Sequence, residues 1–154
     1  MKSKTAIWFE CKVKYEKLQE DGLQKKVTET YVVNALSFAD AEMRITEELA
    51  QYIGGEFTIE DVKKAPYKEI FFADEDAMAD RWYKARLDFI TINEKTEKEK
   101  RTRANYLVQA GTLKKAIVGI EDVMSGTMID YEACAVDATK IEDVFVIDKS
   151  EEQE

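Results

Sequence analysis

Residues 7–15 alternate between two sets of side chains, one apolar and one largely polar. Ile7, Phe9, Cys11, Val13 and Tyr15 fall on one side, and Trp8, Glu10, Lys12 and Lys14 on the other. A period of two predicts a β-strand with one buried face. A turn signal at Glu20-Asp21-Gly22 and a second strand over residues 25–34 complete a predicted hairpin.

At Ser37 the period changes to that of a helix. Ser37 is a suitable N-cap, and Asp40 at the third helical position can reach back to the helix start. The apolar stripe that follows recurs at intervals of three and four residues, and comprises Phe38, Ala41, Ile45 and Leu49. We expect Gly54-Gly55 to end the helix, and strands at 57–62 and 70–72 to follow.

The second half repeats this pattern about 74 positions later. Trp82-Tyr83 corresponds to Trp8-Phe9, Thr112 to the N-cap Ser37, and Leu113, Ala116, Ile120 and Met124 to the helical stripe. Strands at 131–136 and 141–146 complete the second copy. A repeat at fixed spacing predicts the architecture: an α+β chain with an internally duplicated ββαββ repeat, antiparallel sheets, one helix per repeat and a pseudo-twofold arrangement.

We therefore predict a single domain over residues 1–154. It divides into repeat one at about 6–72, an acidic joint at 73–80, repeat two at about 81–147 and an acidic tail at 148–154. The predicted core comprises Phe9, Cys11, Val13, Tyr31, Phe38, Ile45, Leu49, Leu87, Phe89, Tyr106, Leu113, Ile120, Val136 and Phe145.

The chain contains no histidine, which excludes Ser-His and Cys-His catalysis and every His-ligated metal site. We assign no catalytic residue, no metal ligand and no cofactor. An enzyme that uses carboxylate, lysine or tyrosine chemistry is the weaker alternative. Acidic residues that are adjacent in the sequence, such as Glu60-Asp61 and Asp74-Glu75-Asp76, point apart, and we interpret them as solvated. We expect Cys11 and Cys134 to be buried free thiols.

The net charge of −9 argues against a general nucleic-acid binder, but residues 81–110 hold eight basic and four acidic side chains. The candidate binding residues are Trp8, Trp82, Lys84, Arg86, Arg101 and Arg103. Exposed tryptophans beside these bases would form stacking platforms for single-stranded nucleic acid. The alternative is that both tryptophans are covered by protein and that the bases protect a solvated strand edge.

We expect a non-enzymatic binding protein that contacts an unidentified protein or single-stranded nucleic acid through its sheet face. Alternatives are an acidic mimic or inhibitor, and an assembly protein that forms homo-oligomers through exposed strand edges. No apolar run approaches the roughly 18 residues that span a bilayer, and no signal peptide is evident. We therefore expect a cytoplasmic location without membrane contact.

Several stretches carry a family resemblance over about residues 6–147. They are residues 8–17, 25–29, 35–42, 69–72 and 80–84, which read WFECKVKYEK, KKVTE, ALSFADAE, EIFF and DRWYK. In these stretches the chain resembles a family of unknown function from Bacteroidetes and their phages. The resemblance implies a bacterial or phage intracellular setting, and it supplies no activity and no catalytic residues.

Overall fold

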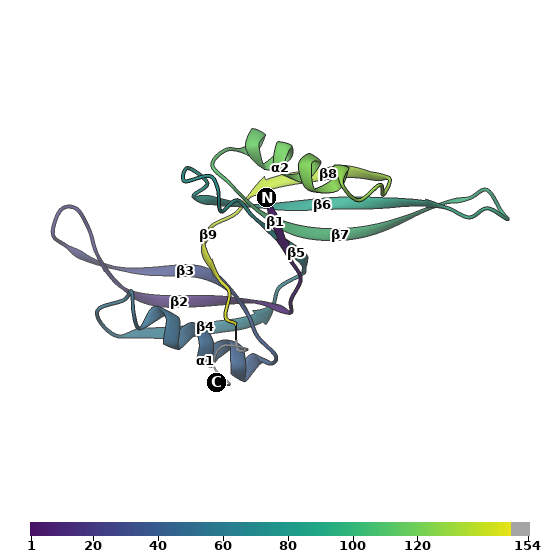
Figure 1. Cartoon of the computed structure of the whole chain (residues 1–154). Coiled ribbons are helices and arrows are strands. Elements are labelled where there is room, and N and C mark those ends of the chain that lie inside the picture. The colour runs from purple at the N-terminus through teal and green to yellow at the C-terminus, as the bar shows by residue number, and fades with distance from the viewer. Residues whose placement is uncertain (149–154) are drawn as a thin grey trace. The chain divides into compact units, whose positions relative to one another are not determined.

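The computed structural model describes residues 1–148, which form two helices and nine strands in two sheets (Figure 1). The acidic tail lies almost entirely outside the described residues. The elements in chain order are β1 (Lys2–Lys4), β2 (Trp8–Leu18), β3 (Gln24–Asn34), α1 (Phe38–Leu49), β4 (Phe57–Lys64), β5 (Tyr67–Phe72), β6 (Arg81–Ile92), β7 (Glu99–Ala110), α2 (Leu113–Ser125), β8 (Tyr131–Ala138) and β9 (Ile141–Phe145).

These elements confirm the predicted α+β class. The β2–β3 and β6–β7 hairpins are the two alternating segments, and each is followed by its predicted helix. Ser37 Oγ accepts a hydrogen bond from Asp40 N, and Thr112 Oγ1 accepts one from Lys115 N, so both expected residues cap their helices. Neither helix of the described chain is long and apolar enough to cross a membrane.

The two glycines expected to end the first helix lie in the loop beyond it. Helix α1 ends at Leu49, with Ala50 as its C-cap. A backbone bond from Ile53 N to Leu49 O closes one further turn before the chain reaches Gly54. The exposed side chain of Tyr52 stacks on Phe145 at 6.1 Å, so the loop before the glycines has packing of its own.

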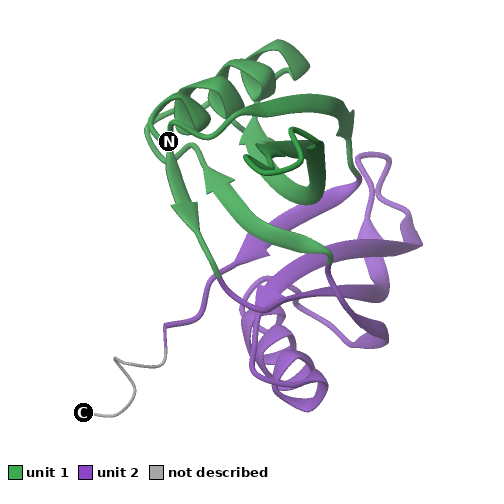
Figure 2. Ribbon diagram, turned by 90° about the vertical axis from the view of Figure 1, so that its right-hand side faces the viewer, with its two compact units in different colours: residues 1–5, 66–139 green, residues 6–65, 140–154 purple. Residues whose placement is uncertain are grey.

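The described chain forms two compact units, coloured separately in Figure 2. Unit 1 comprises residues 1–5 and 66–139, with sheet order β1-β5-β7-β6-β8 and helix α2. Unit 2 comprises residues 6–65 and 140–148, with sheet order β4-β2-β3-β9 and helix α1. The units therefore do not coincide with the two predicted repeats.

The difference arises because each repeat gives its last strand to the other unit. Strand β5, from repeat one, pairs in parallel with β7 of unit 1, and β9, from repeat two, pairs in parallel with β3 of unit 2. Each sheet is otherwise antiparallel in its described strands. The sequence predicted these strands but not the parallel pairing, nor the short N-terminal strand β1.

The strand registers of the two units correspond at the same offset that separates the two sequence repeats. A bulge leaves Glu60 unpaired between β2 and β4, and a second leaves Cys134 unpaired between β6 and β8, 74 positions later. Trp8 O accepts a bond from Ala65 N, and Trp82 O accepts one from Thr139 N. Residues 65 and 139 are the last before the chain crosses to the other unit, so the crossings match too. These agreements support the predicted duplication.

Each unit has an apolar core between its helix and one sheet face. In unit 2 the buried core comprises Phe9, Cys11, Val13, Tyr31, Val33, Ala35, Ala41, Ile45 and Leu49. In unit 1 it comprises Phe71, Tyr83, Ala85, Leu87, Ala104, Tyr106, Val108, Ala110, Ala116, Ile120 and Met124. Of the predicted core, Phe89, Val136 and Phe145 are only half-buried.

Two predicted core residues are exposed. Phe38 and Leu113 are the first residues of their helices, and both are solvent-accessible. A residue directly after the N-cap lies in the first turn, where the helix has only begun to cover the sheet, and Phe38 keeps an edge contact to Phe9. Arg44 and Gly119 complete the buried helix faces instead. Cys11 is buried as expected, whereas the bulged Cys134 is half-exposed.

Candidate functional site

The two tryptophans that we considered as stacking platforms are buried. Trp8 is 1% exposed and Trp82 is 3% exposed. Each lies on the sheet face opposite its unit's helix, as the alternation predicted, and Trp82 also contacts Phe72 edge-on at 5.7 Å. A base cannot stack on a ring that solvent does not reach, so the platform hypothesis is wrong for both residues.

The four basic candidates lie together on that face of the unit 1 sheet. Lys84 and Arg86 are on β6, Arg101 and Arg103 are on β7, and strand pairing sets them on neighbouring positions. Lys84, Arg101 and Arg103 are exposed, whereas Arg86 is half-buried. The sequence therefore located a real cluster of bases.

Acidic residues are interleaved with these bases. Arg101 Nη1 lies 2.6 Å from Glu132 Oε2 and 3.6 Å from Asp88 Oδ2, and Arg101 Nε lies 3.7 Å from Glu99 Oε2. The hydrogen bond and charge of Glu132 raise the pKa of Arg101 above its ordinary value. Arg101 is already engaged by acids of its own unit.

Strand β8 supplies two of the acids on this face. Its pairing with β6 places Asp137 opposite Lys84 and Glu132 opposite Asp88. Paired residues of neighbouring strands project from the same face, so four bases there meet the four acids Asp88, Glu99, Glu132 and Asp137. On this face the positive charge of the four bases is therefore balanced by an equal number of acids.

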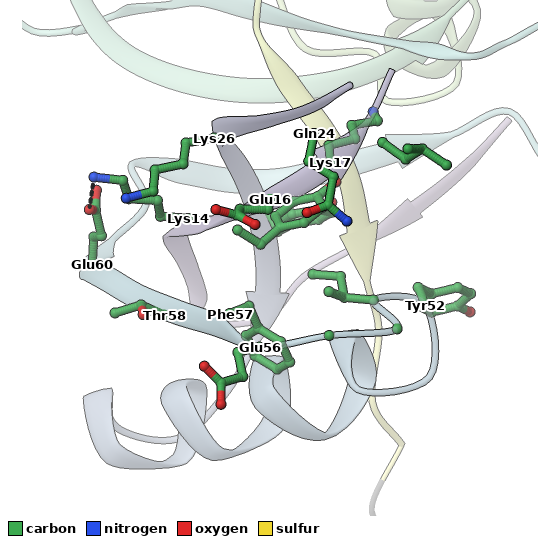
Figure 3. Close-up of a pocket in the computed structure, with 16 residues that line it drawn as sticks. Lys14, Glu16, Lys17, Gln24, Lys26, Tyr52, Glu56, Phe57, Thr58 and Glu60 are labelled. Carbon is green, nitrogen blue, oxygen red and sulfur yellow. Dashed lines mark ion pairs between the residues drawn. The ribbon is translucent and has the colours of Figure 1, made fainter. Parts of the chain in front are cut away.

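A concave site that the sequence did not predict lies within unit 2 (Figure 3). We call it the basin; its volume is about 1150 Å³, and it lies between the β2–β3 hairpin and the loop that joins α1 to β4. Figure 3 shows Glu16, Lys17 and Gln24 on the hairpin side, and Glu56 and Phe57 on the other. The aromatic side chains that line it are Tyr15, Tyr31, Tyr52 and Phe57.

One carboxylate that does not itself line the basin binds two of the tyrosines that do. Glu29 is only 9% exposed, and its Oε1 accepts hydrogen bonds from the hydroxyls of Tyr15 and Tyr31, the latter at 3.2 Å. Lys17 Nζ lies 3.6 Å from the other carboxylate oxygen, Oε2. Because buried carboxylates need such partners, these contacts explain how the sheet holds a glutamate on its core face.

Electrostatics keeps both tyrosines protonated. Burial, together with Glu29 and Glu142, raises the pKa of both the Tyr15 and Tyr31 hydroxyls well above the ordinary tyrosine value. Burial and the charge of Glu29 also raise the pKa of Glu142, against the opposing effect of Lys17. At neutral pH the hydroxyls are therefore hydrogen-bond donors to Glu29 and not nucleophiles.

An aromatic stack forms the second wall. Phe145 lies between Tyr31, at 5.5 Å and 15°, and Tyr52, at 6.1 Å and 11°. Tyr52 is 70% exposed, so this ring is held in place by stacking while most of it faces solvent. A rigid, exposed tyrosine contributes contact area at little entropic cost, which is a property of binding surfaces.

The equivalent place in unit 1 carries different residues. Tyr15, Glu29 and Glu142 correspond to Phe89, Ala104 and Lys68, while Tyr31 corresponds to Tyr106. The ammonium of Lys68 lies over the Phe89 ring, 5.1 Å from its centroid. A concave site of unit 1, between α2 and β8, measures about 360 Å³. The cluster of Glu29 with its two tyrosine donors, Tyr15 and Tyr31, is therefore specific to unit 2.

The basin offers contacts for binding and no evident catalytic group. Within residues 1–148, no three Cys, Asp or Glu side chains converge as metal ligands would. Burial raises the pKa of the nearby Cys11 thiol to about 12, so it is not a thiolate at neutral pH. The sequence did contain one signal: Glu29 occupies an inward position between Val27 and Tyr31, where alternation calls for an apolar residue.

Comparison with known proteins places the chain in a family without assigning an activity. No curated protein and no solved structure matches it significantly. A family model matches residues 7–147, a span that covers both repeats and both hairpins. The chain therefore belongs to the family described as a domain of unknown function, DUF4494.

Proposed function

We propose that this chain is a non-enzymatic binding protein that contacts a protein partner through the β6–β7 hairpin. The observation that carries the proposal is how far this hairpin extends from its sheet, as Figure 1 shows. Strand β8 pairs with β6 only as far as Phe89, whereas β6 and β7 continue to pair to Ile92 and Glu99. Residues 90–101 thus form a two-stranded arm.

A two-stranded ribbon gains little stability from its own contacts in water. This arm nonetheless ends in an ordered turn, in which Asn93 Oδ1 accepts bonds from Lys95 N and Thr96 N. Its side chains include an exposed apolar residue, Ile92, which is 67% accessible, among charges of both signs. The fold of unit 1 gives this extension no evident role. Contact with a partner would give it one.

The charge pattern favours a protein over single-stranded nucleic acid. Phosphate binding needs basic residues that are free to displace counterions. On this sheet face acids are interspersed among the bases, Arg101 is held by three carboxylates, and Trp82 is buried. A surface with mixed charge and scattered apolar side chains is suited to a protein partner. Inhibition by acidic mimicry and assembly with further copies are narrower forms of the same proposal.

The setting that we propose is the cytoplasm of a bacterium, or of the host of a phage. The sequence resemblance to Bacteroidetes and phage proteins supports the source. The cysteines support the compartment, because Cys11 and Cys134 are not joined in a disulfide and Cys11 is buried in the core of unit 2. Free thiols are usual in reducing compartments.

The test compares affinity capture by the full chain with capture by a variant lacking the arm. Because Thr91 and Lys100 are paired across the hairpin, replacing residues 92–99 by Asn-Gly joins them through a two-residue turn and keeps the sheet. The matched control is Met128→Ser, which removes an exposed apolar residue outside the arm. Thermal unfolding of both variants establishes that they fold.

We expect the full chain and the Met128→Ser variant to recover one protein in stoichiometric amount, with or without nuclease treatment. The shortened variant should lose it. Recovery that depends on nucleic acid would contradict the proposal of a protein partner. Recovery that is unchanged in the shortened variant would show that the β6–β7 arm is not the contact surface.

A further inference from the structure

The concave site between α2 and β8 of unit 1 is lined mainly by apolar side chains. We call it the groove, and Figure 1 shows the helix and the strand that enclose it. Ile117 of the helix is 39% exposed and Ala133 of the strand is also exposed, so both apolar walls face solvent. The residues that line the groove are Ile117, Ile120, Glu121, Tyr131, Ala133 and Val136.

The β8 wall of the groove is also an edge of its sheet. Among the described strands, β8 pairs with β6 alone, over Tyr131–Ala138. The backbone N–H and C=O groups on its outer side therefore face no other strand of the described chain. Such an edge accepts an extended segment as a further strand, and a pocket beside the edge can hold every second side chain of that segment.

Unit 2 protects the corresponding edge. Strand β4 corresponds to β8 at an offset of 74 residues, and both strands contain a bulge. Strand β4 ends in Lys63-Lys64, whereas β8 has Asp137-Ala138 at these positions. Lysines on an edge strand discourage pairing with another chain. Unit 1 thus lacks the lysines that guard this edge in unit 2.

The walls of the groove also differ from their counterparts in unit 2. Ala133 stands where unit 2 has Ile59, a residue that packs against the core of that unit. The smaller side chain leaves space between helix and strand. Ile117 stands where unit 2 has Glu42, so an apolar side chain replaces a charged one on the helix. Both differences favour an apolar occupant in unit 1.

The charge of the groove favours a basic residue over an acidic one. Glu121 is the one charged side chain among the lining residues, and no lysine or arginine lies within four residues of it along α2. The ammonium of Lys68 lies over Phe89, and Lys68 does not line the groove. A basic side chain of the occupant is therefore attracted to Glu121, and an acidic one is repelled.

A second copy of β8 fits this edge poorly. Antiparallel pairing of two β8 strands that sets Ala133 of each copy opposite Val136 of the other also sets Glu132 opposite Asp137. Like charges directly opposite each other destabilise a strand pair. The charges thus favour a different chain as the occupant.

We propose that the groove binds an extended segment of a partner protein, which adds to β8 as a further strand. Its alternate apolar side chains lie between α2 and β8, and a basic residue pairs with Glu121. Backbone hydrogen bonds to β8 give such a complex affinity, and the groove determines which side chains fit. The inference does not rest on the proposed function, because no lining residue belongs to the arm at 90–101.

The probe is the peptide Lys-Thr-Val-Thr-Val-Thr-Lys, acetylated at its N-terminus and amidated at its C-terminus. When its first residue lies opposite Ala138, its two valines lie opposite Val136 and Ala133, and its last lysine lies opposite Tyr131. The peptide reads the same in both directions, so the design assumes no strand direction. A second peptide has glutamates in place of the lysines.

The readout is the backbone amide spectrum of the full chain during titration with each peptide. We expect the lysine peptide to bind at least about fivefold more tightly than the glutamate peptide, and to slow amide hydrogen exchange on β8. No binding of the lysine peptide, or binding without slower exchange on β8, would overturn the proposal. Self-association of the chain that the peptide reverses would identify a second copy as the occupant and would also overturn it.

The first variant, Ile117→Gln, removes the apolar wall of the helix. Its matched control is Val118→Gln, which makes a similar change at an exposed neighbour that does not line the groove. We expect Ile117→Gln to weaken binding of the lysine peptide by about tenfold and the control by less than about twofold. Equal effects of the two substitutions would overturn the proposal. Thermal unfolding establishes that both variants fold.

The second variant, Glu121→Thr, installs the residue that unit 2 has at this position, Thr46. Its matched control, Asp122→Thr, removes the same charge from a residue outside the groove. We expect Glu121→Thr to bind the lysine and glutamate peptides within about twofold of each other, whereas the control keeps the preference for lysine. A preference that survives Glu121→Thr would show that another group selects the base and would contradict the assignment of Glu121.

Discussion

Removal of the Glu29 carboxylate tests whether the cluster that it forms with Tyr15, Tyr31 and Lys17 stabilises unit 2. Glu29→Ala deletes the shared acceptor of the Tyr15 and Tyr31 hydroxyls and the partner of Lys17. The two hydroxyls then lie in a half-buried wall without their acceptor. The substitution also removes a buried charge, which by itself would stabilise the fold.

The magnitude follows from these opposing effects. Each hydrogen bond to a charged acceptor contributes about 1.5–3 kcal/mol, and the exposed pair with Lys17 contributes at most about 1 kcal/mol. Relief of the buried charge and access of water to Tyr15 offset part of this. We expect a net loss of about 2 kcal/mol, which lowers the melting temperature of a chain of this size by about 4–8 °C.

A double-mutant cycle separates the cluster from general damage. Adding Tyr15→Phe to Glu29→Ala reproduces Phe89 and Ala104, the natural residues of unit 1. Because one orphaned hydroxyl is removed, we expect the double variant to regain about 1 kcal/mol relative to Glu29→Ala. The assay is urea unfolding of the four proteins at pH 7, followed by circular dichroism.

Two results would refute this reasoning. A loss below about 0.5 kcal/mol for Glu29→Ala would mean that water replaces the carboxylate fully. Strictly additive effects of the two substitutions would mean that Tyr15 and Glu29 do not stabilise each other, whatever their geometry.

Three further predictions concern alkaline pH, the helix caps and the exchanged strands. Burial and Glu69 raise the folded-state pKa of Tyr106 to about 12, and the pKa of Tyr31 is also raised. The contribution of these two tyrosines to the free energy of unfolding is therefore constant near neutral pH and falls above about pH 10, where only the unfolded chain loses their protons. Tyr106→Phe should reduce that fall in urea unfolding at alkaline pH. Ser37→Ala and Thr112→Ala should each cost about 1 kcal/mol in thermal unfolding, because each removes an N-cap acceptor; no loss in either would contradict the capping geometry. Cleavage within the joint at 73–80 should give two fragments that co-purify by size exclusion, because each sheet needs a strand from the other fragment; fragments that fold separately would contradict the strand exchange.

Much of the architecture is encoded locally and could be predicted. Alternation over Ile7–Tyr15 and its counterpart specified the hairpins, and the residues Ser37 and Thr112 specified where the helices begin. These features depend on neighbours within a few positions, so a short window of sequence contains their cause. Local information did not suffice for every residue of the helix stripe. It did not show that the first helical residue, Phe38, is exposed.

The candidate sites depended on contacts that no local pattern contains. The basic cluster was visible from Lys84 to Arg103, but two of the four acids that balance it, Glu132 and Asp137, come from β8, a separate segment further along the chain. The basin is lined by residues of the β2–β3 hairpin, including Tyr15 and Tyr31, and by the loop at Tyr52, which come from separate segments. The inward position of Glu29 was the one local signal, and its meaning required the two tyrosines that surround it.

The sequence by itself determined the α+β class, the two hairpin and helix modules and their offset of about 74 residues. Only the tertiary structure decided where β5 and β9 pair, because a short apolar strand has the same pattern in whichever sheet it is placed. It also decided that both tryptophans are buried and that Glu29 binds the hydroxyls of Tyr15 and Tyr31. Pairing and burial are properties of distant residues brought together, and free energy gained by such contacts cannot be read from adjacent positions.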